Sequence, residues 1–151
     1  MMYLKFTALA AALVFSSTVF CAESFATKKD AEAMVAKAVK AIKTDRADTL
    51  KQITAKNKQW VERDLYAVVY DMTGKCLAHG QNEKQVGKEL LETVDVDGKE
   101  YIKERIELAN SKGKFWQEYK FTEPLTKKVL PKQAYCEKTA DLIVCAGVYK
   151  H

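Results

Sequence analysis

Residues 66–80, with the sequence YAVVYDMTGKCLAHG, constrain the fold of this chain more than any other segment. β-Branched and aromatic residues dominate the run up to Tyr70, and the residues from Asp71 to Gly74 are of the types that form tight turns. The pattern predicts two antiparallel strands joined by a short turn, with His79 at the end of the second strand.

A helical pattern precedes this hairpin. From Thr27 onward, apolar residues recur at intervals of three and four, and Asp30 completes a weak capping box with Thr27. A second start signal lies at Thr44 or Asp45. The helix is therefore expected either to break and resume there or to continue with a kink to about Lys58.

The remainder of the chain supplies shorter helices and three more strands. The pattern predicts a helical turn over 86–91, a helix over 99–111 that Gly113 ends, and strands near 115–121, 132–138 and 142–149. Short connections favour antiparallel pairing. The expected fold class is α+β, a central antiparallel sheet of about five strands with a long N-terminal helix packed on it.

The chain has 151 residues, which is enough for one domain. Residues 1–26 have the pattern of a signal peptide, with Lys5 ahead of an apolar run over 6–20, and residues 27–151 form the domain. The expected location is periplasmic. An uncleaved anchor is the alternative, although the apolar run is shorter than the ~18 residues of a membrane span.

The cleavage position is open on sequence grounds. Ser24 and Ala26 supply the small residues that a cut after Ala26 requires, and a cut after Cys21 or Ala22 is the alternative. A lipoprotein signal is not expected at Cys21, because bulky residues precede it where small ones are needed.

Three cysteines lie in the predicted domain, and export places them in an oxidising compartment. A hairpin centred on Ala140 and Asp141 places Cys136 directly opposite Cys145, within the reach of a disulfide. We expect this bond; two reduced, buried cysteines are the alternative. Cys76 is left over.

Charge and metal-ligand spacing exclude several functions. The 25 basic and 20 acidic residues are interleaved, so no concentrated basic face for nucleic acid is expected. Two histidines cannot form a structural zinc site with cysteines spaced as these are. Residues 93–104 resemble a calcium loop, but Thr93 replaces its first acidic ligand, and an acidic turn before the helix explains the same residues. No metal or cofactor is expected.

Catalytic motifs are also missing. His79 is the one conventional base inside the domain, and Cys76, three residues away in a strand, is expected on the opposite face. The sequence contains no nucleophile elbow, phosphate loop or dinucleotide fingerprint. The chain is therefore not expected to be an enzyme; His79 as a general base is the remote alternative.

A set of aromatic and cationic residues remains. Such residues line small-molecule pockets, and they equally fill a core of polar-tipped aromatics. On its own, Lys132 is typical of a solvated strand end and His79 of a structural histidine. The set comprises Tyr66, His79, Tyr101, Trp116, Tyr119, Lys132, Tyr135 and Tyr149.

The order and spacing of short motifs resemble a known family. These motifs include DLY at 64–66, LAHG at 77–80, VGK at 86–88, DGK at 97–99 and AGVYK at 146–150. Between them stand Tyr70, Asp71, Gly74, Asn82, Gly113, Trp116, Tyr119, Pro124, Lys132 and Tyr135. From about Ala31 to its end, the chain resembles the single Cache domain, a PAS-like extracellular sensor module of bacterial chemoreceptors and sensor kinases.

The resemblance implies one ligand cavity between the sheet and the segments that cover it. Family ligands are mostly small organic acids, and the matching positions here are His79, Tyr101, Trp116, Tyr119, Lys132 and Tyr135. It implies a non-catalytic sensor that acts through a membrane receptor or kinase partner, in chemotaxis or signal transduction. The alternative is a structural or protein-interaction α+β module without a small-molecule ligand.

This chain departs from the family pattern in two places. The segment GKFW at 113–116 lacks the small residue that often precedes the tryptophan, and the last hairpin turn is shortened. Both border the expected cavity, so they bear on the identity of the ligand.

Overall fold

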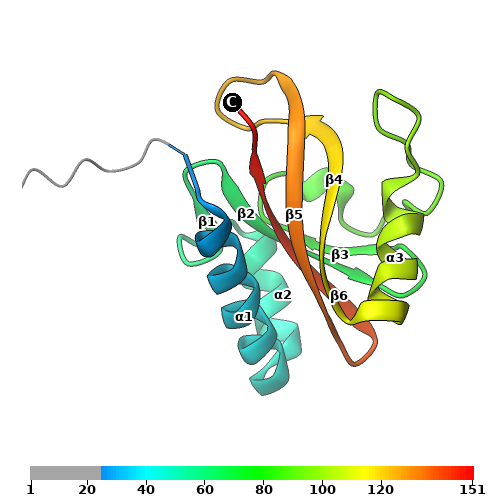
Figure 1. Cartoon of the computed structure of the whole chain (residues 1–151). Helices are drawn as coiled ribbons and strands as arrows, with labels where there is room; N and C mark the ends of the chain where they lie inside the picture. The colour runs from blue at the N-terminus through cyan, green and yellow to red at the C-terminus, as the bar shows by residue number, and fades with distance from the viewer. Residues whose placement is uncertain (1–24) are drawn as a thin grey trace, which may run out of the picture.

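Six antiparallel strands form one sheet at the centre of the computed structural model, which describes residues 25–151 (Figure 1). The strands are β1 (Val61–Glu62), β2 (Leu65–Asp71), β3 (Cys76–His79), β4 (Lys114–Thr122), β5 (Val129–Thr139) and β6 (Leu142–Tyr149). Their order is β1-β2-β6-β5-β4, and β3 also pairs with β2. The predicted fold class is confirmed, and the strand beyond the expected five is the two-residue β1.

The N-terminal amphipathic segment folds as two helices. These are α1 (Lys28–Thr44) and α2 (Arg46–Thr54). Thr27 caps α1 in the predicted capping box with Asp30. Asp45 lies between the helices in an extended conformation, and its side chain caps α2. Of the two sequence-based alternatives, the helix therefore breaks and resumes.

A long connection and one further helix lie between β3 and β4. The predicted helical turn over 86–91 is absent, and a 3₁₀ turn, η1, covers Glu83–Gln85 instead. Helix α3 spans Tyr101–Lys112 and ends at Gly113, whose φ of 72° is left-handed. The acidic segment before α3 folds as a turn, because Asp95 accepts the backbone N–H groups of Asp97 and Lys99. No group of three metal-ligating side chains occurs in residues 25–151.

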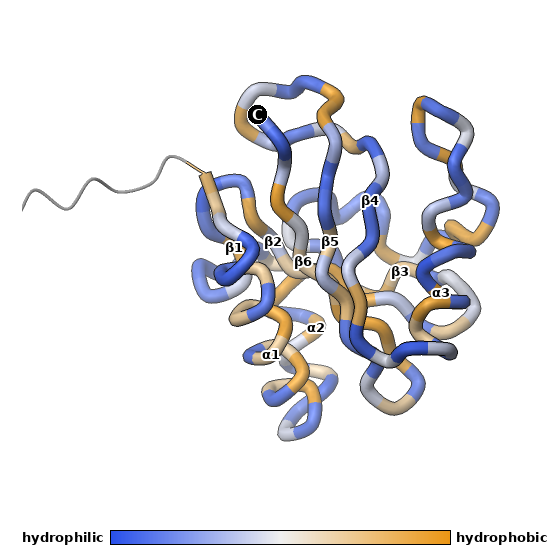
Figure 2. The backbone as a smooth tube through the Cα atoms, in the orientation of Figure 1, coloured by the Kyte–Doolittle hydropathy of each residue, from blue (hydrophilic) through white to orange (hydrophobic). Residues whose placement is uncertain are grey.

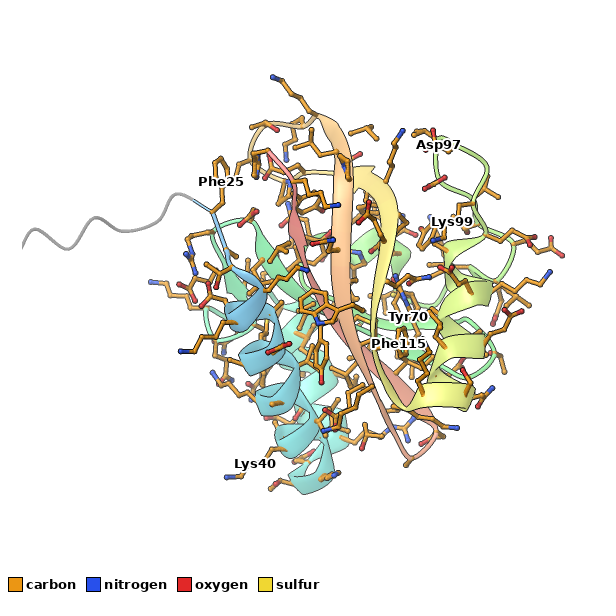
Figure 3. All side chains as sticks on the ribbon, in the orientation of Figure 1. Phe25, Lys40, Tyr70, Asp97, Lys99 and Phe115 are labelled. Atoms are coloured by element: carbon orange, nitrogen blue, oxygen red, sulfur yellow. A yellow bond between two sulfur atoms is a disulfide. The ribbon has the colours of Figure 1, made fainter. Side chains whose placement is uncertain are left out.

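The sheet is buried on both faces (Figure 1). Helices α1 and α2 cover one face, which we call the α1 face, and their apolar stripes pack on alternate residues of β2 and β6. Helix α3 and the preceding loops cover the other, the α3 face, where Figure 3 shows Tyr70 and Phe115 between the sheet and α3. Figure 2 shows hydrophobic residues at the centre, along β2 and β6, and hydrophilic residues on the outer turns of the helices.

The last hairpin confirms the predicted disulfide. Strands β5 and β6 pair in the expected register, with Cys136 opposite Cys145 and the turn at Ala140 and Asp141. The two sulfur atoms are bonded, and the Cα atoms lie 4.2 Å apart. Cys76 is the free cysteine of the described residues, and it is buried.

One register prediction was wrong. Cys76 and His79 lie on the same face of β3, not on opposite faces, because a β-bulge interrupts the pairing of β2 with β3. Cys76 pairs with Tyr70 and His79 with Val68, so four residues of β3 stand against three of β2. The extra residue reverses the expected alternation.

The two ends of the described chain meet beside β1. The ring of Phe25 stacks on His151 with centroids 3.5 Å apart, and the Ala26 amide donates to buried Asp64 at 2.7 Å. The predicted signal peptide lies outside the described residues except for Phe25 and Ala26. No helix of the described part is long and apolar enough to cross a bilayer.

Candidate ligand-binding site

Five strands each bring at least one polar-tipped side chain to the α3 face. Alternation along each strand places these residues on the same side of the sheet, because paired residues in antiparallel strands share a face. Tyr119 on β4 stands opposite Lys132 on β5, which stands opposite Tyr149 on β6. Tyr66 on β2 and His79 on β3 complete the set.

Lys132 is buried among the rings of this set. Its side chain is only 3% exposed, and Nζ lies 4.0 Å from the ring centroid of Tyr66 and 4.9 Å from that of Tyr149. The prediction of a solvated strand end, made for this lysine on its own, is therefore corrected. Burial lowers the pKa of Lys132 well below its ordinary value, and the positive charge of Arg105 lowers it further.

A hydrogen-bonded relay leads away from Lys132. Nζ donates to Tyr66 Oη at 2.8 Å, Tyr66 Oη lies 3.1 Å from Tyr149 Oη, and Tyr149 donates to the carbonyl of Thr122 at 3.0 Å. An ammonium has three N–H donors. Only one of them has a partner among the described residues, and Lys132 forms no ion pair there.

Gly147 makes room for the lysine side chain. A Cβ atom on Gly147 would lie 2.6 Å from Cε of Lys132 and 3.0 Å from Cα of Ala134. Real Cβ atoms essentially never show a contact as short as 2.6 Å. The lysine stem therefore crosses β6 at its one residue without a side chain.

His79 is held as a neutral donor. Its Nδ1 accepts the backbone N–H groups of Gln81 at 3.1 Å and Asn82 at 3.0 Å, so the neutral ring carries its proton on Nε2. Burial, helped by the charge of Lys132, lowers the pKa of His79 to about 3. The ring stays uncharged at neutral pH.

A pocket of ≈ 430 Å³ opens beside Tyr66 and His79. Its walls come from β2, β3, the loop with η1, and the end of β4 with the loop that follows. The lining residues are Tyr66, His79, Gln81, Asn82, Gln85, Phe121, Thr122, Pro124 and Lys127. Lys132 lies directly behind this wall, since its Nζ contacts Tyr66 and lies 5.5 Å from the Phe121 ring centroid.

A second pocket of ≈ 190 Å³ adjoins the first and shares Gln85, Phe121 and Thr122 with it. Tyr101 lines this second pocket. Its ring stacks on Tyr119 with centroids 4.5 Å apart, and Phe121 meets both rings edge-on. The aromatic rings therefore form the partition between the two pockets and the interior.

A family model described as Single Cache domain 2 matches residues 10–150. The chain belongs to this family. The match covers nearly all of the sequence, so it confirms the family that the motif order indicates. Cache domains are non-catalytic sensory modules, and those of this type are extracellular or periplasmic.

Solved structures of chemotaxis proteins and of a Cache chemosensory domain share the fold. A methyl-accepting chemotaxis protein from Vibrio parahaemolyticus is 23% identical, with a TM-score of 0.69 over 81% of this chain and 87% of that one. A structure reported for carboxylic acid recognition by a Cache chemosensory domain is 20% identical, with a TM-score of 0.70 over 82% and 92% of the two chains. A periplasmic sensor domain of a chemotaxis protein is 19% identical, with a TM-score of 0.65 over 82% of this chain and 90% of that one. No curated protein matches the sequence.

Two predicted site residues of this Cache domain lie elsewhere. Trp116 and Tyr135 face α1, where they pack against the core of that face, and Lys28 lies over the Trp116 ring. Their side chains point away from Lys132 because side chains alternate along a strand. Tyr135 is three residues from Lys132 on β5, and Trp116 is three residues from Tyr119, the partner of Lys132, on β4. The structure therefore brings four of the six together: His79, Tyr101, Tyr119 and Lys132.

Sequence reasoning missed Arg105, a buried cation on the same side of the sheet. Arg105 lies on α3, is 1% exposed, and packs beside Tyr101 and Tyr119. A signal for it exists in the sequence. Arg105 is three residues from Ile102 and four from Ala109, which places a charged side chain within the apolar stripe of the helix.

Proposed function

We propose that this Cache domain is an exported sensor that binds a small organic acid through Lys132 and performs no chemistry on it. The observation that carries the proposal is the buried lysine, which has no acidic partner and two unused donors within the described part of the chain. A buried, unpaired ammonium is costly. A carboxylate from a ligand would remove that cost through a charge-assisted hydrogen bond.

The surroundings of Lys132 fit a small carboxylate. Tyrosine hydroxyls and the Nε2–H of His79 supply neutral donors, and the aromatic rings exclude water. The pocket of ≈ 430 Å³ is large enough for an acid of several carbon atoms. Another Cache domain with a similar fold is reported to recognise carboxylic acid, which supports the same ligand class here.

The size of such a ligand limits its affinity. Very small ligands gain at most about 1.5 kcal/mol per non-hydrogen atom, so acetate could gain about 6 kcal/mol, a dissociation constant on the order of tens of micromolar. The domain would therefore respond to metabolites at sub-millimolar to millimolar concentration. Signalling would pass through a receptor or kinase partner.

Thermal unfolding against a panel of organic acids, amino acids and amines tests the proposal. A ligand at about one hundred times its dissociation constant stabilises the folded state by about 2.7 kcal/mol, which raises the midpoint by several degrees. We expect organic acids to do so, and the amines not to.

Substitutions of lysine residues show whether the thermal shift depends on Lys132. Lys132→Ala and Lys132→Met, which keeps an apolar stem, should abolish the shift, whereas exposed Lys128→Ala should retain it. A shift that survives both Lys132 substitutions would remove the lysine from the site. No response to any acid would favour the interaction-module alternative.

A further inference from the structure

Arg105 is a buried guanidinium with unused donors. Its Nε donates to Gln117 Oε1 at 3.0 Å, while Nη1 and Nη2 are both buried and have no hydrogen-bond partner among residues 25–151. Leaving buried donors of a charged group unpaired is more costly than leaving neutral ones. The side chain is 1% exposed, so bulk water does not satisfy them.

Three tyrosine rings surround the guanidinium. Its central carbon lies 5.1 Å from the ring centroid of Tyr70, 5.6 Å from that of Tyr101 and 5.2 Å from that of Tyr119. Cation–π contacts of this kind offset part of the desolvation cost. They do not replace the acceptors that the in-plane Nη hydrogens require.

Gln117 fixes the orientation of Arg105. While its Oε1 accepts from Arg105, its Nε2 donates to the Tyr101 carbonyl at 2.7 Å and to Glu104 at 2.5 Å. Gln117 therefore occupies the Nε edge of the guanidinium, and the end with Nη1 and Nη2 is free to bind a ligand. Two parallel N–H groups at that end match the two oxygens of a carboxylate.

Two buried cations therefore share the interior of the α3 face. Tyr119 connects them, since it pairs with Lys132 across β4 and β5 and lies beside Arg105. Neither cation forms an ion pair in residues 25–151. A monocarboxylate at Lys132 would leave the Arg105 charge uncompensated.

We infer that Arg105 is a second carboxylate anchor and that the ligand is a small dicarboxylate, one end at Lys132 and the other at the Nη1/Nη2 edge of Arg105. The inference rests on the proposed function and narrows its ligand class. Arg105 lies behind Tyr101, which lines the smaller pocket. A dicarboxylate that enters through the adjoining pockets reaches Arg105 when the Tyr101 ring is displaced.

Calorimetric titration with matched acids tests the inference. The probes are malonate, succinate and glutarate, each compared with the monocarboxylate of the same chain length: propionate, butyrate and pentanoate. We expect at least one dicarboxylate to bind about tenfold or more tightly than its partner, because a bidentate contact to a charged group is added. In Arg105→Gln, the ratio of dicarboxylate affinity to monocarboxylate affinity should fall to about threefold or less, and the monocarboxylate affinity should be nearly unchanged.

The stability of Arg105→Met without ligand separates a binding role from a structural one. An apolar side chain of similar length removes the unpaired buried charge, so we expect the unfolding midpoint to hold or rise. A lower unfolding midpoint for Arg105→Met, together with an unchanged affinity ratio in Arg105→Gln, would show that Arg105 has a structural role and does not bind the ligand. If monocarboxylates bind as well as every dicarboxylate, this inference fails and the proposed function stands; if no acid binds, both fail.

Discussion

At the scale of single residues, the site depends on polar groups that are buried without their usual partners. Among residues 25–151, Lys132 and Arg105 carry unused donors. Burial and the charge of Lys132 keep His79 neutral, while two backbone N–H groups donate to its Nδ1. Burial disfavours the charged forms of Lys132 and His79 in the free domain. The pH dependence of stability should therefore report them.

His79 should make the domain less stable as the pH falls. Its pKa is about 3 in the folded state and about 6.5 when unfolded, so the unfolded chain binds more protons between these values. Stability is complete above pH 6.5 and falls by up to about 1.4 kcal/mol per pH unit below it. Denaturant unfolding from pH 4.5 to 7 measures this slope.

The His79→Gln variant is the control, because carboxylates and His151 are present in both proteins and their contributions cancel in the difference. The variant should show a smaller slope over the same range. Equal slopes would mean that His79 is not held neutral by its surroundings.

Substitutions at Gly147 and Lys132 should have non-additive effects on stability. In Gly147→Ala, the new methyl group collides with the lysine stem and displaces the ammonium, so we expect weaker acid binding and a loss of about 1–3 kcal/mol of stability. A double-mutant cycle with Lys132→Ala, which removes Cε, should show that the second substitution recovers part of the stability. Additive effects would contradict the contact.

At the scale of elements, the β5–β6 hairpin supplies both Lys132 and the disulfide. The bond closes a short loop and lies four residues along each strand from the pair Lys132 and Tyr149. In the chain-entropy model, such a loop contributes about 2–3 kcal/mol. Reduction should lower the unfolding free energy by that amount, and the Cys136→Ala/Cys145→Ala variant should be insensitive to reductant.

Cys76 provides an internal check on this hairpin. Burial raises the pKa of its thiol to about 11, so it should not react with thiol reagents in the native state. A domain of residues 25–151 should show one reactive thiol after unfolding without reductant. Three such thiols would show that the predicted bond does not form in solution.

Sequence patterns predicted the elements better than the faces of the sheet. Both faces are covered, so β6 is buried throughout and its pattern does not say which residues face α3. For the same reason Trp116 and Tyr135 could not be separated from Lys132 by hydrophobicity alone. The bulge in β3 depends on pairing with β2, which a single strand's sequence does not reveal.

Arg105 shows a different limit of sequence reasoning. Its position within the apolar stripe of α3 was visible, but a long side chain can also extend to solvent from such a position. The contact with Gln117 and the surrounding tyrosines, which come from other elements, decides that it is buried.

At the scale of the whole molecule, the start of the domain is tied to its end. Phe25 stacks on His151, its carbonyl accepts from Arg63, and Ala26 donates to Asp64. Asp64 is completely buried. For the predicted signal peptide, these contacts favour the earlier cleavage positions, after Cys21 or Ala22, because a cut after Ala26 would remove them.

A domain that begins at Thr27 should therefore be less stable than one that begins at Phe25. We expect a loss of about 1–3 kcal/mol, because a buried carboxylate loses its backbone donor, and a midpoint lower by several degrees. Thermal unfolding of the two proteins measures the difference. Equal midpoints would show that these end contacts contribute nothing to the fold.

The central claim is that a small carboxylate binds at Lys132 on the α3 face. A crystal structure of the domain with the acid that gives the largest thermal shift tests it most directly. We predict a carboxylate oxygen within about 3.2 Å of Lys132 Nζ. An acid bound on the α1 face, or Lys132 bonded to Tyr66 alone while the acid lies elsewhere, would contradict the claim.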